Sequence, residues 1–600
     1  MSKLKYRVIS KISLLFCLAA LIVGCGDSSG SSDTLNTQTG YLVDSAVVGV
    51  AYETPTHSGV TGEDGSFQYE LGELVSFKLG DTFLGSTTAQ QTVDLFDLVE
   101  DASPPIGRKA MSLHLWDDSS PFQAVINLAV FLQTLDQDGD FSNGISITPA
   151  VADLFSGKEI NFNQAWAMFI SDFDFLSVLN QANSQALLRG VRKVNNPSLA
   201  LNHLYATMGI SIFVPVYVEE DFNGDGTKIG ITTNEIDANG NLTRREYDGN
   251  GDGKVDSFFA YQFDVYNNLI RQENDFNGDG SVVDIRTYQY DANDNLILEE
   301  DDVGDDGVAD IIITYQYGAN RNLVQRDEDY NGDGLVDISN TYQYEVNGNL
   351  TWEELNLGTD GLADGTLTYQ YDTNNNITRK GYDENGDGIE EQIFTYQFDT
   401  NGNLIKQVDD NYGQDKIFSY QFDASGNLIR EEVDYYGNGT DLWIVTYQYD
   451  TNDNLVLKDV DSDGDGAADV VLTYIYDAKG NLIREQSDYD EDGSTSFSSS
   501  INYQYDASSN LTRQEVDLED DGAADRIYTF QYDANNNLTL EAIDDDGDGG
   551  ADELKKYRYD ANSNLTYEEQ DYDGDGTADS ITTTTYQIGG WGYFFLNDLL

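Results

Sequence analysis

Short acidic loops in the second half of the chain hold the residues with the clearest chemical potential. One loop has Asp329, Asn331, Asp333 and Asp337 at the first, third, fifth and ninth places of D-x-N-x-D-G-x-x-D, with Gly334 at the sixth. Alternate oxygen-bearing side chains, with a backbone carbonyl at the seventh place, can converge on one hard cation. Ca²⁺ accepts roughly six to eight oxygens in flexible geometry, whereas Mg²⁺ demands a tighter octahedron. The pattern therefore predicts calcium binding.

The same loop recurs in register along the chain, and seven copies keep a full set of oxygen ligands. Other copies are degraded: Gly304 and Gly358 stand at the third place of the loops that begin at Asp302 and Asn356, and residues 409–417 have lost the pattern. A single loop could be a solvated acidic turn, but seven in register favour calcium. Beside the loop at 329, the full sets are Asp248, Asn250, Asp252 and Asp256; Asp383, Asn385, Asp387 and Glu391; Asp461, Asp463, Asp465 and Asp469; Asp517, Glu519, Asp521 and Asp525; Asp544, Asp546, Asp548 and Asp552; and Asp571, Asp573, Asp575 and Asp579.

These loops differ from an EF-hand, because strands are predicted on both sides and no Glu closes the loop at the twelfth place. An acid at the ninth place followed by a strand is more similar to the calcium hairpins of integrin-type propeller repeats. That resemblance covers only the loop.

Each acidic loop belongs to a longer repeat. Alignment on an Asn-Leu pair gives thirteen units, spaced by 27 residues except for one spacing of 24 and one of 29. Alternation such as Ile311, Ile313 and Tyr315 predicts a strand, Asn- and Gly-rich segments such as 237–241 predict tight turns, and a second strand such as 427–432 leads into the acidic loop. The predicted fold is mainly β: a repetitive β-hairpin array, either a solenoid or a shell-like curled sheet.

The unit also resembles a known repeat. YQYDANDNL at 288–296, FQYDANNNL at 530–538 and YRYDANSNL at 557–565 are similar to the Y-x-Y-D-x-x-x-N-L signature of the YD repeats of the RHS family. The resemblance covers about residues 230–588. It implies β-hairpins that coil into a hollow shell. The calcium loop, the longer period and an Asn in place of Gly-Arg before the Leu depart from the family.

The N-terminus predicts export and lipid attachment. An apolar run at 12–23 follows several basic residues, is too short to span a bilayer, and is typical of a signal peptide. LIVGC at 21–25 resembles the bacterial lipobox, which implies cleavage before Cys25 and a lipid anchor on that cysteine; an ordinary signal peptide or a single anchor helix is the alternative. We therefore expect a lipid-anchored protein of the bacterial cell envelope, at the outer membrane and exposed on the surface.

Two regions separate the anchor from the repeats. Residues 40–100 have strand patterns typical of a small β-sandwich, and residues 101–215 switch to a helical period that predicts about four helices. Between the first two helices, Asp136, Asp138 and Asp140 repeat the alternate-acid spacing and predict either a further metal site or an acidic loop. The expected organisation is a signal peptide (1–24), a lipidated cysteine and tether (25–39), the β-sandwich (40–100), the helical domain (101–215), the repeats (219–588) and a C-terminal cap (589–600).

The charge of the chain narrows the choice of partners. It has 107 acidic and 32 basic residues and a net charge of −75. Such a surface repels nucleic acid, so we expect no nucleic-acid partner, and contact with the membrane only through the lipid. If the loops lie along one sheet edge two strands apart, their spacing is roughly 10 Å. The Debye length is about 8 Å, so neighbouring empty loops would still repel one another, and calcium is expected to stabilise the array cooperatively.

No catalytic set is predicted. His57, His114 and His203 lie outside the repeats with no matching Cys or Ser context, and the acids sit at ligand spacing. The Gln between the two aromatics of most units predicts a polar ladder, either a glycan- or protein-binding face or a plain solvated one. The opposite tyrosine face must be buried, because the sheet curls on itself or because two sheets pack.

These patterns predict a calcium-binding scaffold, structural or adhesive, that binds surface glycans or proteins and is not an enzyme. The first alternative is an RHS-like shell that encloses or delivers a toxin, although residues 588–600 are too short to be a toxin domain. The second alternative is a carbohydrate-active enzyme with its site within residues 40–210.

Overall fold

The computed structural model describes most of the chain beyond the N-terminal segment. The predicted signal peptide, Cys25 and nearly all of the tether lie outside the described residues. Among the residues described, no helix is both long enough and apolar enough to cross a membrane. The described ranges are 37–106, 108–318, 321–346, 348–358, 362–411, 414–440, 442–489 and 497–597.

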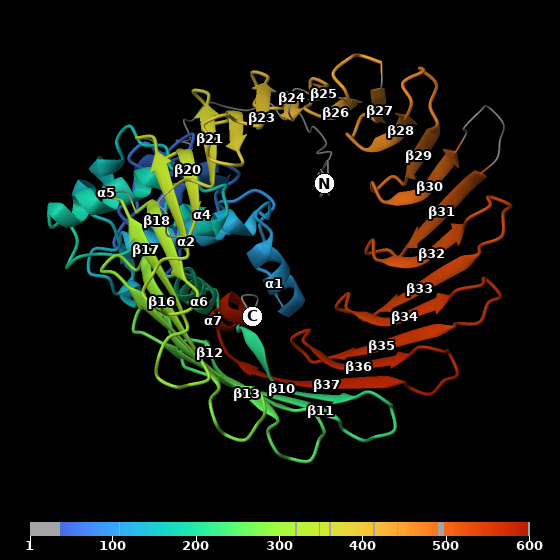
Figure 1. Cartoon of the computed structure of the whole chain (residues 1–600), viewed down its shortest axis with the longest axis horizontal. Helices are drawn as coiled ribbons and strands as arrows, with labels where there is room; N and C mark the ends of the chain where they lie inside the picture. The colour runs from blue at the N-terminus through green and yellow to red at the C-terminus, as the bar shows by residue number, and fades with distance from the viewer. Residues whose placement is uncertain are drawn as a thin grey trace, which may run out of the picture.

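The repeats form a closed ring of 28 antiparallel strands in the described part of the chain (Figure 1). The first half contains β10 (Phe213–Asp221), β11 (Gly230–Ile236), β12 (Leu242–Asp248), β13 (Ser257–Phe263), β14 (Leu269–Asp275), β15 (Asp284–Tyr290), β16 (Leu296–Val303), β17 (Ile311–Tyr317), β18 (Leu323–Asp329), β19 (Ile338–Tyr344), β20 (Leu350–Leu357), β21 (Gly365–Tyr371), β22 (Ile377–Asp383) and β23 (Gln392–Phe398). The second half contains β24 (Leu404–Asn411), β25 (Gln414–Phe422), β26 (Leu428–Asp434), β27 (Leu442–Tyr449), β28 (Leu455–Asp461), β29 (Val470–Tyr476), β30 (Leu482–Tyr489), β31 (Phe497–Tyr505), β32 (Leu511–Asp517), β33 (Arg526–Tyr532), β34 (Leu538–Asp544), β35 (Glu553–Tyr559), β36 (Leu565–Asp571) and β37 (Ser580–Ile588).

The ring closes between its first and last strands. Each strand from β11 to β36 pairs with the strand before it and the strand after it in the sequence. The first strand, β10, pairs with β11 and also with the last strand, β37, so that Val218 lies opposite Thr232 on one side and Thr584 on the other. Closure removes both free edges of the sheet. The prediction of a mainly β, shell-like curled sheet of hairpins is confirmed.

The tight turns explain the repeat signature. In the turn between β27 and β28, the carboxylate of Asp450 accepts hydrogen bonds from the backbone N–H groups of Asn452 (2.7 Å) and Asn454 (3.0 Å) and from the side-chain amide of Asn454 (3.0 Å). Asp453, just before that Asn, has φ +62°, in the left-handed region. The Asp and Asn of the D-x-x-x-N motif thus cap their own turn.

Further hydrogen bonds tie each hairpin to its neighbour. The hydroxyl of Tyr449, the second aromatic of its unit, donates to the carbonyl of Leu428 in the preceding hairpin at 2.9 Å. On the turns, Asn427 donates its side-chain amide to Asp453 of the next turn at 3.0 Å. The same tyrosine contact recurs at Tyr290, Tyr371 and Tyr505.

The tyrosine face is the inner face of the ring. Tyr261 is buried, and Phe263 and Leu269 on the same face pack against the core of the helical region. Figure 1 shows helices of that region within the outline of the ring. The Gln between the aromatics, as at Gln316, is exposed on the outer face.

Most inner tyrosines are half-buried, whereas the sequence predicts a buried face. A single sheet that curls into a ring covers them only through neighbouring side chains. The guanidinium of Arg326 lies 5.9 Å from the ring centre of Tyr315, and the hydroxyl of Tyr447 lies 3.4 Å from the carboxylate of Glu431. Charged side chains therefore shield the rings in place of a second sheet.

The region before the ring combines small sheets with helices around one core. Phe67 and Phe77, from different sheets, meet edge to face with ring centres 5.3 Å apart. Its strands are β1 (Gln38–Leu42), β2 (Val47–Val48), β3 (Ala51–Glu53), β4 (Ser58–Val60), β5 (Ser66–Tyr69), β6 (Leu74–Leu79), β7 (Thr82–Thr88), β8 (Thr92–Val93) and β9 (Ile145–Ser146). Its helices are α1 (Arg108–Trp116), α2 (Phe122–Thr134), α3 (Pro149–Ala152), α4 (Trp166–Phe169), α5 (Phe173–Ser184) and α6 (Pro197–Thr207), with 3-10 turns at Phe141–Asn143 and Asp153–Phe155.

The sheets and helices of this region are joined. β2 pairs in parallel with β9, and every residue of α2 is buried. The sequence pattern predicts about four helices where six are present; α3 and α4 are single turns of four residues, too short to show a helical period. The segments 40–100 and 101–215 share one hydrophobic cluster.

The chain returns to this core after the last strand. Helix α7 (Gly592–Asn597) follows β37, and the buried ring of Trp591 lies 5.3 Å from the rings of Phe122 in α2 and Tyr205 in α6. The strand β10 leaves the same region directly after α6. Both ends of the ring are therefore anchored in one core.

Truncation of the anchoring side chain tests this arrangement. Trp591→Ala is expected to lower the free energy of unfolding by about 3–5 kcal/mol, because it empties a fully buried aromatic site. Trp591→Phe should recover part of that loss. Urea denaturation of the full chain provides the measurement, and an unchanged midpoint for Trp591→Ala would show that closure does not depend on this contact.

The turn carboxylates give the ring an acid-sensitive component. Hydrogen bonds from Asn454 hold the pKa of Asp450 below its usual 3.8, against a smaller effect of burial. A group with a lowered pKa stabilises the fold above its unfolded pKa, and that contribution is lost as the pH falls through the folded value.

We expect Asp450→Asn to be less stable than the native chain at pH 7, by about 0.5–1 kcal/mol after allowance for solvent screening. The difference should shrink below about pH 3.8, as the native carboxylate becomes protonated. Urea denaturation from pH 7 to about pH 3.5 measures it, with the exposed Glu63→Gln as control. An equal loss at every pH would indicate a role independent of the charge.

Candidate metal centre

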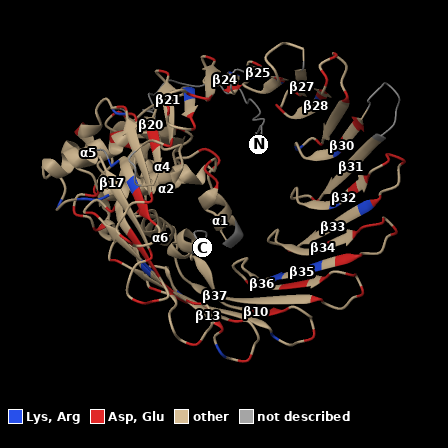
Figure 2. Ribbon diagram, viewed as in Figure 1, with Lys and Arg blue, Asp and Glu red and all other residues tan. Residues whose placement is uncertain are grey.

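The predicted calcium loops lie together on one rim of the ring. Every acidic loop connects the end of one hairpin to the start of the next, whereas the tight turns occupy the other rim. Figure 2 shows that many Asp and Glu residues lie on the loops along the outer edge of the ring. Within the described ranges, the repeats thereby place the acids of their loops in one circular row.

The loop at 329 shows how the backbone arranges the oxygens. Asp329 is buried, and its carboxylate accepts the N–H groups of Asn331 (3.2 Å) and Gly334 (2.7 Å). The side-chain oxygen of Asn331 accepts the N–H of Asp333 (3.0 Å), and Asp337 accepts the N–H of the second place (2.8 Å). The predicted ligand side chains of Asp329, Asn331 and Asp337 therefore accept hydrogen bonds from the backbone of their own loop.

Four of the seven predicted loops bring three carboxylate oxygens within 4.8 Å of one another. The predicted loops at Asp248, Asp329 and Asp517 do not, among the described residues; the first two have an Asn at the third place. The convergent sets are Asp383, Asp387 and Glu391; Asp461, Asp463 and Asp465; Asp544, Asp546 and Asp548; and Asp571, Asp573 and Asp579.

Two of these loops contain a carboxylate oxygen with no donor. The Oδ2 atoms of Asp544 and Asp571 accept N–H groups from Gly549 and Gly576 at 2.9 Å. Their Oδ1 atoms are buried and have no hydrogen-bond partner in the described part of the chain. A buried polar atom without a partner costs free energy. A cation in the loop would supply that partner, so the residues fit Ca²⁺.

The first carboxylate of the loop is held in its charged form. Burial by itself would raise the pKa of Asp248, but the N–H groups of Gly253 and Gly251 outweigh it and hold that pKa below its usual value. The pKa of Asp329 is lowered in the same way. Hard cations bind the ionised carboxylate, so these groups are ready for a metal at neutral pH.

A glycine at the fourth place joins successive loops. Gly332 has φ +63°, and a Cβ on it would lie 2.1 Å from the carbonyl oxygen of Ala309 in the preceding loop. Gly224 meets Ala578 in the same way across the closing pair of strands. The acidic loops therefore touch one another around the rim, including where the ring closes.

Sequence reasoning missed two loops of the same construction. Asp275 is fully buried and accepts the N–H groups of Gly278 (2.7 Å) and Gly280 (2.8 Å), and Asp221 accepts the N–H of Gly226 (2.7 Å). Both begin D-F-N-G-D-G but have an apolar residue at the ninth place. The first six residues, D-F-N-G-D-G, identify these two loops in the sequence, whereas a search that requires an acid at the ninth place excludes them.

The acidic loop of the helical region is arranged differently. Asp136 is buried and accepts the N–H groups of Gly139 and Ser146, both at 2.8 Å. Asp138 accepts the N–H of Asp140 at 2.9 Å. The guanidinium of Arg192 lies against Gly139 and faces Asp136 and Asp138, so a protein cation already balances these acids.

The structure also pairs histidines with serines that the sequence did not connect. His203 Nε2 lies 2.9 Å from Ser45 Oγ and 3.8 Å from Asp44 Oδ1, and Ser45 has φ +58°. Burial raises the pKa of Asp44 to about 7, against a hydrogen bond from Gln133. His114 Nδ1 similarly lies 2.9 Å from the hydroxyl of Ser120. The first contact ties the turn after β1 to α6.

Comparison with known proteins finds solved structures of low similarity and no match among family models or curated sequences. The crystal structure of TcdB2-TccC3-TEV matches with TM-score 0.37 and 16% identity over 61% of this chain and 19% of that one. TcdB2-TccC3 without its hypervariable C-terminal region gives 0.37 and 15% over 65% and 20%. A porin-like protein from Bacteroides uniformis gives 0.17 and 12% over 46% and 95%.

This chain therefore spans about a fifth of the length of the TcdB2-TccC3 structures that it matches.

The contact between loops is open to a paired test. Gly332→Ala should lower the free energy of unfolding by roughly 3 kcal/mol or more, because the new methyl group meets the Ala309 carbonyl and adopts a positive φ. Gly334→Ala, also at positive φ but facing open space, should cost only about 1–2 kcal/mol. Urea denaturation compares the two, and equal losses would show that successive loops do not touch.

Proposed function

We propose that the protein is a calcium-stabilised, closed β-hairpin scaffold of the bacterial cell envelope, anchored by a lipid on Cys25. The observation that carries this proposal is the circular row of acidic loops, which continues in direct contact across the closing strands. In this proposal the ring serves to present surfaces for binding and is not an enzyme.

Electrostatics support the calcium part of the proposal. Loops in contact hold the acids of neighbouring loops near one another, and a Debye length of about 8 Å screens such charges only in part, so the empty rim repels itself. The Oδ1 atoms of Asp544 and Asp571 are buried and accept no hydrogen bond in the described part of the chain, so a bound cation would give each of them a partner. Calcium at the convergent loops would reduce the repulsion between loops and give these oxygens a partner. Each filled loop would also raise the calcium affinity of the next loop.

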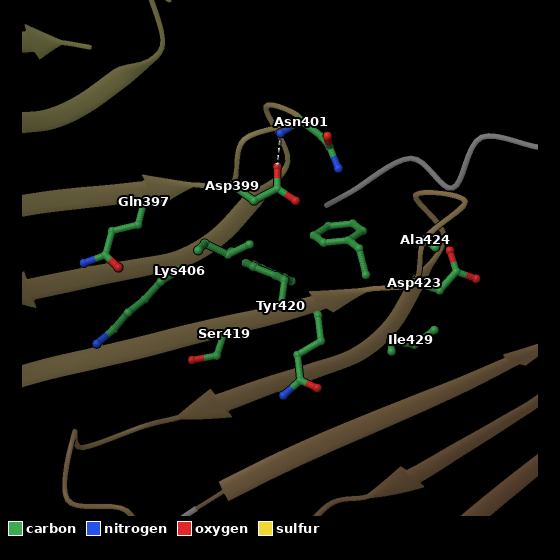
Figure 3. Close-up of a pocket in the computed structure, with 12 residues that line it drawn as sticks. Gln397, Asp399, Asn401, Lys406, Ser419, Tyr420, Asp423, Ala424 and Ile429 are labelled. Atoms are coloured by element: carbon green, nitrogen blue, oxygen red, sulfur yellow. Dashed lines mark hydrogen bonds between the residues drawn. The ribbon is translucent and has the colours of Figure 1, made fainter. Parts of the chain in front are cut away.

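The outer face supports a role in binding. A groove of about 760 Å³ crosses three neighbouring strands, on which Gln397 pairs with Lys406 and Lys406 with Ser419. Figure 3 shows these side chains beside the tight turns that carry Asp399 and Asp423. Gln397 is exposed, and Lys406 and Ser419 are half-buried. Amide, ammonium and hydroxyl groups in one row suit a polar ligand such as a surface glycan or a protein.

Ring closure favours a second candidate, an RHS-like shell that encloses or delivers a toxin. A closed ring has an interior that an open stalk lacks, and its inner face carries the tyrosines and charged side chains described above. Both candidates share the calcium-dependent rim.

Thermal unfolding of the full chain tests the proposal. With Ca²⁺ at about 1 mM, the weak end expected for extracellular modules, we expect the Tm to exceed that in excess chelator by roughly 10 °C or more. Each site filled at about 100 times its Kd adds about 2.7 kcal/mol.

A matched pair of variants isolates the loops. Asp571→Asn removes a ligand from a convergent set and should reduce the calcium-dependent rise. Asp305→Asn removes the same charge from a degraded loop and should leave the rise intact. No calcium-dependent shift in the native chain would mean that the acids form only a solvated edge.

A further inference from the structure

A cleft of about 890 Å³ lies between the helical region and the inner face of the ring. One wall comes from the segment after α5, with Arg189, Arg192 and Lys193, and the other from the hairpins β14 to β19. Its volume is in the range of ligand pockets, about 300–1,000 Å³. The cleft is separate from the calcium rim, because tight turns border it.

The charge of the cleft opposes that of the chain. Acidic residues outnumber basic ones by 107 to 32 overall, yet four cations and two carboxylates line this space. Lys193 is paired with Asp294, with Nζ and Oδ1 2.6 Å apart. Asp138 faces Arg192. Asp138 also faces Arg189, and Arg321 faces Asp291 and Asp294. The lining itself still has two more cations than carboxylates, so it offers a net positive charge to a ligand.

Arg321 occupies a strained position. It has φ +64° at the place where the other described turns have Gly, Asn, Asp or Ser. Its Nε donates to Asn295 at 2.9 Å, and its Nη2 donates to the carbonyl of Asn293. These bonds hold the guanidinium at the border of the cleft, and strain of this kind is commonly retained for function.

Other groups in the cleft lack partners within the protein. Arg192 Nη2 has no hydrogen-bond partner in the described part of the chain. The hydroxyls of Tyr317 and Tyr344 also make no hydrogen bond there, whereas Tyr290 in a neighbouring hairpin donates to Leu269 at 2.9 Å. The cleft thus combines unsatisfied donors with amphipathic aromatic rings.

We propose that this cleft binds a short acidic oligosaccharide. A uronate carboxylate would accept hydrogen bonds from Arg192 and Arg321, since guanidinium groups match carboxylates in a bidentate geometry. The sugar rings would lie against Tyr317 and Tyr344, whose free hydroxyls would bond to sugar hydroxyls. This site goes beyond the scaffold function and does not depend on calcium at the rim.

Isothermal titration calorimetry of the full chain in calcium tests the site with trigalacturonate as the probe. The neutral trisaccharide maltotriose should bind at least about tenfold more weakly, the loss expected for charge-assisted hydrogen bonds. Inorganic phosphate and glucose 1-phosphate are titrated in the same way, to test whether the cleft binds a phosphate. Binding of these phosphates without binding of trigalacturonate would overturn the oligosaccharide and assign the cleft to a phosphate.

Two variants and a control complete the test. Arg321→Asn should weaken trigalacturonate binding about tenfold or more while the melting temperature is kept, because Asn is accepted at this turn place in Asn375 and Asn536. Arg192→Gln should weaken it similarly and serves if the first variant fails to fold. Arg526→Gln, on an exposed side chain elsewhere in the ring, should bind as the native chain does. Native affinity in both cleft variants, or equal binding of the neutral sugar, would overturn the proposal.

Discussion

The pairing of β10 with β37 is the constraint on which the rest of the structure depends. The two strands are separated by nearly the whole array, and their meeting is expensive in chain entropy. The core stabilises this pairing at both ends of the array. The strand β10 begins shortly after α6, which lies in the hydrophobic core, and Trp591, which follows β37, packs into the same core. Between these two ends, the tyrosine contacts and the self-capped turns only have to maintain the register of each hairpin against the next.

A second constraint is electrostatic. The hairpins pack by bringing their acidic loops into contact, so the geometry that closes the sheet also concentrates negative charge on one rim. The fourth-place glycines make the approach possible, and in the loops at Asp248 and Asp329 backbone N–H groups stabilise the negative charge of the first Asp. The inner cleft lies on the other side of the ring, where Arg and Lys side chains gather instead.

Much of this could be predicted from the sequence, because the repeat encodes it locally. The period of two, the turn residues and the D-x-N-x-D-G spacing identify strands, turns and loops, and the carboxylates of four predicted loops do converge. Closure could not be derived in this way, since no local pattern specifies that Val218 meets Thr584. The cleft could not be predicted either, because Arg192 and Arg321 are far apart in the chain, Arg192 belongs to no motif, and Arg321 stands at a variable position of the repeat turn.

Closure also sets a rule for how such a gene can change length. One unit of 27 residues encodes two strands, so an in-frame duplication or loss of one unit keeps an even strand count and leaves the closing pair antiparallel. The fourth-place glycine of the new loop would find the same neighbouring carbonyl. Such a change would alter the circumference of the ring while the anchoring core is preserved. The ring can thus widen or narrow in whole hairpins without a new closure having to evolve.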